Sequence, residues 1–253
     1  MRIVIITQND PFYLKKNLEY LVTIIPKNCE IVGCIVDDVS QFGRKKSFIF
    51  KSIRTLQIFG VKFFTYYAIR FIKAKFENNS IRKFLAENKI EEIKLDKPIN
   101  SDESIKKIKS FNPDLLVSIL GGQIFKKKLI NLCENGCINL HTSLLPKYRG
   151  MMPTFWVLKN NEKSTGVSVF FVDEGIDSGP IIVQEKFNIG NRTQAELIKF
   201  SKKKGMEAIA KAINLINEKK YKLMPNSEKD KSYYSFPTRK DVIDFKKLNK
   251  KFY

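Results

Sequence analysis

The chain has 253 residues, of which 43% are hydrophobic, and it carries a formal net charge of +20. This length suits one domain with a modest appendage, and the hydrophobic fraction excludes an intrinsically disordered protein. Only eight of the 46 basic residues are arginine, so we interpret the lysine surplus as solvated surface and not as a nucleic-acid footprint, for which clustered arginine is typical.

Neither export nor membrane insertion is indicated. The N-terminal MRIVIITQND holds an apolar run too short for a signal-peptide core. Lys62 and Arg70 interrupt the longest aromatic region, so no stretch reaches the length of a membrane span. We therefore expect a cytoplasmic protein. The cysteines lack CxxC spacing and a companion histidine cluster, which predicts buried free thiols and no metal site at Cys29, Cys34, Cys133 and Cys137.

Continuous apolar runs predict the first strands of a sheet. They lie at Arg2 to Thr7, Glu30 to Val36, Asp114 to Leu120 and Cys137 to Leu140. Helical stretches separate them, the first ending near Ile25. Unbroken apolar runs are typical of parallel strands covered on both faces. The predicted class is therefore α/β, with a Rossmann-like, mainly parallel sheet, helices on both faces and function at the carboxyl ends of the strands.

Two nucleotide-binding motifs are absent. No GxGxxG follows the first strand, and GxxxxGK[ST] occurs nowhere in the chain. These patterns mark dinucleotide binding and phosphate-cradling loops respectively. Hydride transfer and nucleotide triphosphate hydrolysis are thereby disfavoured.

The second half predicts two more strands and a long helix. The strands cover Val167 to Val172 and Ile181 to Phe187. Thr193 and Glu196 form a T-x-x-E capping box for a helix from about Gln194 to Glu218.

We place a catalytic domain at residues 1–218. Residues 219–253 are rich in lysine and read as an irregular C-terminal appendage packed on that domain.

Residues 40–79 interleave aromatic and basic side chains and predict one or two helices. Such helices can contact a membrane surface through residues 41–76. We favour a helix pair packed on the sheet or at a dimer contact, because aromatic stripes usually mark a core. A homodimer is thus left open.

The single histidine, His141, ends the predicted strand CINLH. Asn139 lies two residues earlier, so both side chains project from one face of the strand. Asp177 lies between Gly175 and Gly179, whose tight turns can hold its carboxylate near a strand end. These three side chains are the candidate catalytic residues, although a lone histidine is more often structural and an aspartate can simply form a turn.

Two segments carry a resemblance to a known family. INLHTSLLPKYRG covers Ile138 to Gly150, and STGVSVFFVDEGIDSGPII covers Ser164 to Ile182. Together with LLVSILGGQIF and the 38-residue separation of Asn139 and Asp177, they resemble the formyltransferases that use 10-formyltetrahydrofolate. The resemblance covers residues 112–185.

The resemblance implies roles for the candidates. Asn139 and His141 would hydrogen-bond the formyl oxygen as negative charge develops on it, and Asp177 would orient and support the imidazole. The formyl donor would be 10-formyltetrahydrofolate. Its implied binding residues are Gly122, Gln123, Ile124, Asp173, Glu174 and Gly175.

The acceptor amine follows from comparison within that family. TQNDPFY replaces the glycine-rich phosphate turn of enzymes that formylate glycinamide ribonucleotide. The 35 residues after the last predicted helix (253 − 218) are too few for the C-terminal barrel of methionyl-tRNA formyltransferases. Members that hydrolyse formyltetrahydrofolate carry an extra N-terminal domain, whereas the first predicted strand of the catalytic type starts here at Arg2. We therefore do not expect hydrolysis.

The closest resemblance, through RGMMPTFWVLKNNEKSTGVSV, is to sugar N-formyltransferases. It implies a nucleotide-linked amino sugar of surface polysaccharides as the substrate. Asn9, Asp10 and Tyr13 at the end of the first strand are the candidate substrate-binding residues.

Two other functions stay open. One is a methionyl-tRNA formyltransferase-like enzyme that uses its basic surface in place of a barrel, with tRNA affinity that falls steeply with salt. The other is a basic membrane-peripheral binding protein without catalytic activity.

Overall fold

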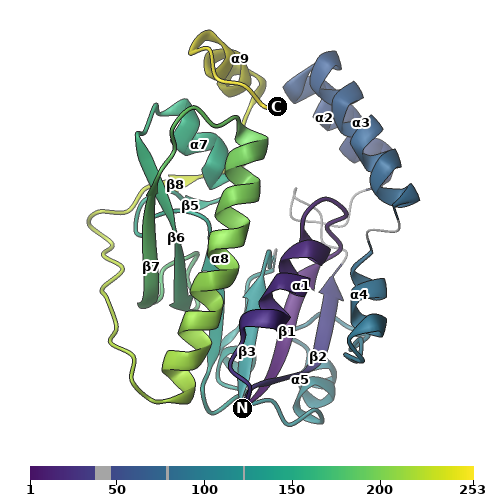
Figure 1. Ribbon diagram of the computed structural model, residues 1–253, viewed down its shortest axis with the longest axis vertical. Helices are drawn as coiled ribbons and strands as arrows, with labels where there is room; N and C mark the ends of the chain where they lie inside the picture. Colours follow the sequence, from purple (N-terminus) through teal and green to yellow (C-terminus); the bar gives the residue numbers. More distant parts are fainter. Residues whose placement is uncertain (38–46, 78–79, 122) are drawn as a thin grey trace.

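The computed structural model describes residues 1–37, 47–77, 80–121 and 123–253. Its main sheet has the strand order β2-β1-β3-β4-β6-β7 (Figure 1). The strands are β1 (Arg2–Gln8), β2 (Glu30–Asp37), β3 (Leu115–Ile119), β4 (Cys137–His141), β6 (Ser164–Phe171) and β7 (Ile181–Asn188). Neighbours from β2 to β4 pair in parallel, whereas β6 pairs antiparallel with both β4 and β7. The predicted mainly parallel sheet is confirmed.

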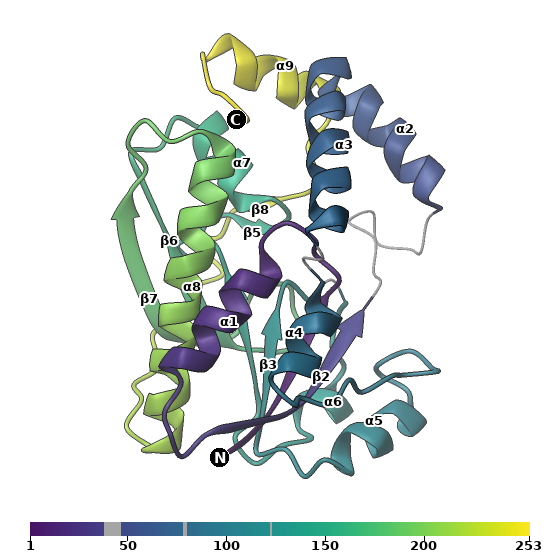
Figure 2. The ribbon, with the colours of Figure 1, turned by 45° about the vertical axis from the view of Figure 1, so that its right-hand side comes forward.

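Helices cover both faces of this sheet, as predicted (Figures 1 and 2). One face carries α1 (Leu14–Ile24), α4 (Ile81–Glu87) and α8 (Gln194–Asn217), and the other carries α5 (Asp102–Lys109) and α6 (Lys127–Ile130). Ile3 and Ile5 of β1 belong to the hydrophobic cluster that contains α1 and α8. The alternate residues Val4 and Ile6 belong to the cluster that contains α5 and α6. Side-chain alternation along one strand therefore supplies both cores.

The carboxyl ends of three strands form one edge. Thr7 of β1 is opposite Ile119 of β3, and Ile119 is opposite Leu140 of β4. The chain leaves β1 through α1 on one face and leaves β3 through α6 on the other. This reversal is a topological switch point, where α/β sheets bind ligands.

The capping box predicted for the long helix is confirmed. The Thr193 hydroxyl accepts from the Glu196 backbone N–H, and the Glu196 carboxylate accepts from the Thr193 N–H at 2.8 Å. Satisfying these donors fixes the first turn of α8. Ile209, Ile213 and Ile216 are buried, as their helical spacing predicts.

The aromatic region forms two helices, α2 (Phe48–Phe59) and α3 (Val61–Phe76). Gly60 separates them with a φ of 86°, a conformation that favours glycine. Residues 40–46 and 78–79 of the predicted segment lie outside the described residues.

The predicted packing of this helix pair on the sheet is wrong. Phe59 and Phe63 belong to a second hydrophobic cluster, with Phe155 of α7 (Pro153–Lys159) and Phe245 of α9 (Arg239–Lys247). The aromatic side chains do form a core, but this core lies between α2, α3, α7 and α9 and not against the main sheet. We call it the upper core.

The C-terminal segment is more regular than predicted. β8 (Tyr233–Tyr234) pairs in parallel with β5 (Arg149–Gly150), and α9 begins with a capping box between Thr238 and Asp241. The prediction of an irregular tail is therefore wrong for these residues. The T-x-x-D pattern that starts α9 is the same signal that revealed α8.

The tail packs on the rest of the chain. The Phe245 ring is fully buried, and its centroid lies 5.0 Å from that of Phe155 and 4.5 Å from that of Phe252. The backbone N–H groups of Gln194 and Ala195 donate to carbonyls of the last three residues at 2.9 Å. A domain boundary at residue 218 stays a prediction.

All four cysteines are free and buried. Burial raises the pKa of the Cys34 and Cys133 thiols to about 12. Among the residues that the structure describes, no helix is long and apolar enough to cross a bilayer.

Replacing Phe245 by alanine should lower the free energy of unfolding by about 3–5 kcal/mol, because it empties a stacked, buried ring site. Urea unfolding followed by circular dichroism measures this loss. Lys247→Ala, at an exposed position of the same helix, is the control and should change little. An unchanged midpoint in Phe245→Ala would show that the tail is not part of the cooperative unit.

Candidate active site

His141 is the last residue of β4, and its side chain is held at the carboxyl edge of the sheet. It is 7% exposed, and its Nε2 lies 2.7 Å from the backbone carbonyl oxygen of Tyr148. A carbonyl only accepts, so Nε2 carries a proton and donates it. In the neutral ring, Nδ1 then has the free lone pair, and it lies 3.5 Å from Asp177 Oδ2.

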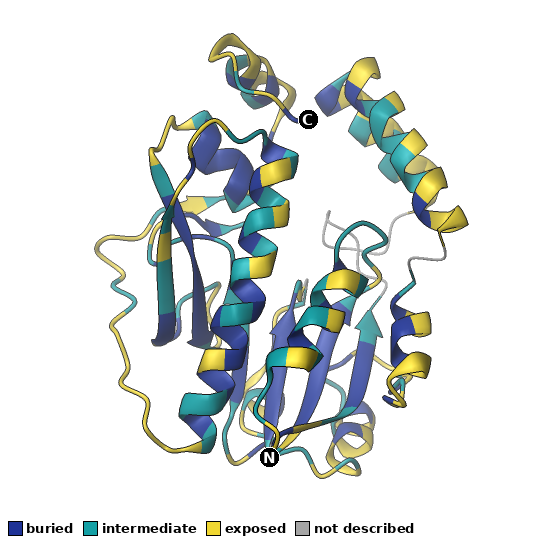
Figure 3. Cartoon of the chain, in the orientation of Figure 1, coloured by how far each residue is buried: buried dark blue, intermediate teal, exposed yellow. Residues whose placement is uncertain are grey.

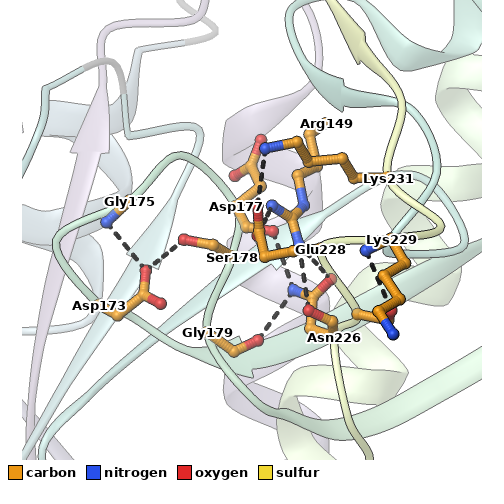
Figure 4. A network of polar contacts seen from close by, with 11 residues as sticks. Arg149, Asp173, Gly175, Asp177, Ser178, Gly179, Asn226, Glu228, Lys229 and Lys231 are labelled. Carbon is orange, nitrogen blue, oxygen red and sulfur yellow. Dashed lines mark hydrogen bonds and ion pairs between the residues drawn. The ribbon is translucent and has the colours of Figure 1, made fainter.

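Asp177 is held in a left-handed conformation with a φ of 49°. Its Oδ2 accepts from the Gly150 N–H at 2.8 Å. The Asn226 amide donates to the carbonyls of Asp177 and Gly179, both at 2.9 Å (Figure 4). The Asn226 side chain thus satisfies carbonyl groups of a loop that belongs to no helix or strand.

The tail supplies the brace for this loop. Arg149 is 4% exposed; its guanidinium donates to the side-chain oxygen of Asn226 at 2.9 Å and also pairs with Glu228 (Figure 4). Because Asn226 accepts from Arg149 while donating to the loop, residues 149, 177 and 226 form one network. Sequence reasoning missed Asn226 and Glu228, since nothing local marks them.

The two glycines near Asp177 act differently from the prediction. Neither Gly175 nor Gly179 has a left-handed φ. A Cβ at Gly179 would collide with the Phe171 carbonyl oxygen, and one at Gly175 with the Ser178 hydroxyl. These glycines allow close packing, and the aspartate itself takes the strained conformation.

Asn139, two residues before His141, has a buried carboxamide oxygen with no hydrogen-bond partner among the described residues. Nearly all buried polar groups in proteins are paired, so such an orphan calls for a physical reason. A ligand N–H or O–H group at this edge would supply one, because the amide oxygen only accepts.

The first segment implied for folate binding follows β3. Gly122 lies outside the described residues. The Gln123 amide donates to the carboxylate of Asp37 at the end of β2. Ile124 is exposed, and its carbonyl accepts from the Asn100 side chain at 2.9 Å. The segment is therefore tied to neighbouring loops while its apolar side chain faces solvent.

The second segment is the loop that contains Asp177. The Asp173 carboxylate accepts from the Gly175 N–H at 3.0 Å and from the Ser178 hydroxyl at 2.6 Å (Figure 4). Glu174 is exposed. Asp173 therefore shapes the loop, whereas Glu174 is free to face a ligand.

The predicted substrate residues lie after β1. Asn9 is exposed. Asp10 pairs with Lys202 of α8 at 3.1 Å, and the same ammonium lies 5.3 Å from the centroid of the Tyr13 ring. The Tyr13 hydroxyl accepts from Arg70 of α3 at 3.1 Å.

Arg70 was not predicted as a site residue. Its guanidinium lies 4.9 Å from the Phe12 ring centroid and 5.1 Å from that of Tyr13. Among the described residues, no carboxylate forms an ion pair with it. Lys202 was also missed, because it lies 192 residues from Asp10 in the chain. We name Asp10, Tyr13, Arg70 and Lys202 the β1-end cluster.

The two groups of residues lie on the same edge. The ends of β1 and β4 are separated by β3 alone, which puts them about 10 Å apart at the usual strand spacing. An amide, an imidazole and a carboxylate can stabilise a developing oxyanion and accept a proton. The β1-end cluster offers cations whose distance from His141 is about the length of a small substrate.

A family model described as formyl transferase matches residues 70–213. A methionyl-tRNA formyltransferase from Clostridioides difficile is 34% identical over 198 residues, which are 77% of this chain and 54% of the relative. The chain therefore spans about half the length of that curated relative.

Solved structures share the fold. An N-formyltransferase from Helicobacter canadensis, in complex with folinic acid and dTDP-3-aminofucose, aligns with a TM-score of 0.59 and 22% identity over 92% of this chain and 70% of its own. A sugar N-formyltransferase from a Shewanella species aligns with a TM-score of 0.62 and 18% identity, over 98% and 87% of the two chains.

These identities show the architecture alone, whereas the family model covers more than half of the sequence, including Asn139, His141 and Asp177. The resemblance predicted from the sequence is thereby confirmed. The chain belongs to the formyl transferase family.

Proposed function

We propose that this protein transfers a formyl group from 10-formyltetrahydrofolate to an amine, with Asn139, His141 and Asp177 as the catalytic residues. The observation that carries the proposal is the Asn139 carboxamide, whose buried oxygen has no hydrogen-bond partner among the described residues, beside an imidazole whose Nδ1 faces a carboxylate at 3.5 Å. Because that oxygen is an acceptor, an N–H of the acceptor amine would satisfy it.

The three side chains divide the chemistry. When bound, the folate supplies the formyl carbon, whose bond to the folate nitrogen breaks as its bond to the acceptor amine forms. Negative charge grows on the formyl oxygen, where the Asn139 amide N–H can donate. The amine must lose a proton, and His141 can accept it at Nδ1 because Nε2 is already protonated towards Tyr148. The same proton would then go to the folate nitrogen that leaves, which returns the imidazole to its neutral form.

Asp177 stabilises the protonated ring. The negative carboxylate lies beside the nitrogen that gains the proton, and both side chains are largely buried, at 8% and 14% exposed. Burial lowers the effective dielectric constant and strengthens that attraction. Asn226 and Gly150 keep the carboxylate in place, so they are positioning groups.

The folate would lie at the switch point between β1 and β3, against Gln123 and Ile124 and the loop of Asp173, Glu174 and Gly175. The exposed Ile124 offers an apolar contact for a planar ring. This location would place the formyl carbon next to Asn139 at the end of β4.

For the acceptor we propose a nucleotide-linked amino sugar. Its diphosphate would meet Arg70 and Lys202, and its base or sugar would contact Tyr13 and Asn9. A guanidinium without a carboxylate partner suits a phosphate group. The Helicobacter canadensis protein of the same fold was solved with such a nucleotide sugar. Methionyl-tRNA is the second candidate, since the curated relative formylates it.

Asn139→Ala should lower kcat on the order of a hundredfold, as loss of an oxyanion donor does elsewhere. His141→Ala should abolish turnover. The measurement is tetrahydrofolate release, followed by absorbance. Asn188→Ala, at the exposed last position of β7, is the control. Near-normal turnover in Asn139→Ala would contradict the assigned chemistry.

Assaying a panel of nucleotide-linked amino sugars together with methionyl-tRNA should give turnover with one sugar and none with tRNA. Turnover with tRNA alone would replace the proposed acceptor by the second candidate. No turnover with any amine, at measured folate binding, would refute formyl transfer itself.

Arg70→Gln should raise KM for the phosphate-bearing acceptor roughly tenfold to a hundredfold, because a charge-assisted hydrogen bond is lost. KM for the formyl donor should stay the same. Arg54→Gln, on the exposed side of α2, removes the same charge as a control. Equal effects of the two variants would mean that Arg70 has no specific role.

A further inference from the structure

The helix α3 exposes an apolar stripe that no part of the described chain covers. Ile69, Ile72 and Phe76 are 67%, 55% and 86% exposed, and their spacing of three and four residues puts them on one side of the helix. With Lys73 and Glu77 they line a shallow hollow of about 510 Å³.

Folding does not account for this outer stripe, which comprises Ile69, Ile72 and Phe76. The same two helices already bury Phe59 and Phe63 in the upper core. A surface helix needs only one apolar side. Figure 3 shows many exposed residues at the end of the helix pair farthest from α9. A contiguous exposed apolar patch usually marks an interaction site.

The charge of the helix pair indicates what the stripe meets. Between Phe48 and Phe76 the chain has no acidic residue. Its basic residues there are Lys51, Arg54, Lys62, Arg70, Lys73 and Lys75. Arg70 belongs to the β1-end cluster, and Lys73 forms an exposed ion pair with Glu77 at 3.6 Å. The other four, which form no ion pair among the described residues, are available to an external partner.

We propose that α2 and α3 dock on an anionic lipid surface. The outer stripe would enter the boundary between headgroups and acyl chains, while the flexible lysines reach the lipid phosphates. Clustered basic residues on an amphipathic helix are typical of such binding. The α3 helix has 16 residues and would lie along the surface.

Two other occupants fit less well. A second copy of the chain would bring the same positive charges against each other, which opposes association. An RNA would use the lysines but leave the three apolar side chains in water. Of these three occupants, an anionic bilayer is the one that satisfies both the charge and the apolar surface.

The test is sedimentation of the full chain with vesicles of phosphatidylcholine, with and without phosphatidylglycerol. Binding should require the anionic lipid and weaken as salt is raised. Ile72→Ser/Phe76→Ser and Lys73→Gln/Lys75→Gln should each reduce the partition coefficient roughly tenfold or more. Formyl transfer in solution should be unchanged, because none of these residues lies in the candidate active site.

The control variants remove an apolar side chain or two lysines at other places on the surface. Leu223→Ser changes a half-exposed leucine of the C-terminal segment, and Lys106→Gln/Lys109→Gln changes two exposed lysines of α5. Both should bind vesicles as the unmodified chain does. Equal losses in the control pair would reduce the effect to net charge and overturn the proposal.

Three further outcomes would also overturn it. They are no binding to anionic vesicles, salt-sensitive binding to tRNA that the Ile72→Ser/Phe76→Ser change leaves intact, and a dimer in sedimentation equilibrium that the same change dissolves. The last would identify a second copy of the chain as the occupant.

Discussion

Burial of both faces of the parallel strands is the constraint on which this structure depends. Ile3 to Ile6 and Leu115 to Val117 are at most 3% exposed, so neither face of the sheet centre is open to a substrate. Polar chemistry is confined to the carboxyl edge, where the strands end and backbone groups become available. His141 is the point at which β4 passes from buried strand to this edge.

The site itself is held by segments far apart in the chain. Tyr148 fixes the imidazole, Gly150 fixes the carboxylate of Asp177, and Asn226 fixes the backbone beneath it. Each contact involves a group that the sheet leaves without a regular partner. Because Arg149 binds Asn226 as well, displacement of the tail would release both loops together.

Sequence patterns predicted those features that depend on local physics. Unbroken apolar runs gave the strands, and Thr193 with Glu196 gave the start of α8. Asn139, His141 and Asp177 could be selected because strand periodicity and a family motif mark them. Lys202, Asn226 and Arg70 could not, since each acts through a contact between distant segments. The start of α9 is marked by the same local T-x-x-acid pattern, at Thr238 and Asp241.

The brace formed by Asn226 also sets an order of events during synthesis. The ribosome delivers Asp177 49 residues before Asn226, whose side chain secures its loop. A nascent chain can therefore complete most of its sheet while its catalytic loop is still unsecured. The active site would be complete only after the tail is synthesised and Asn226 binds the loop of Asp177.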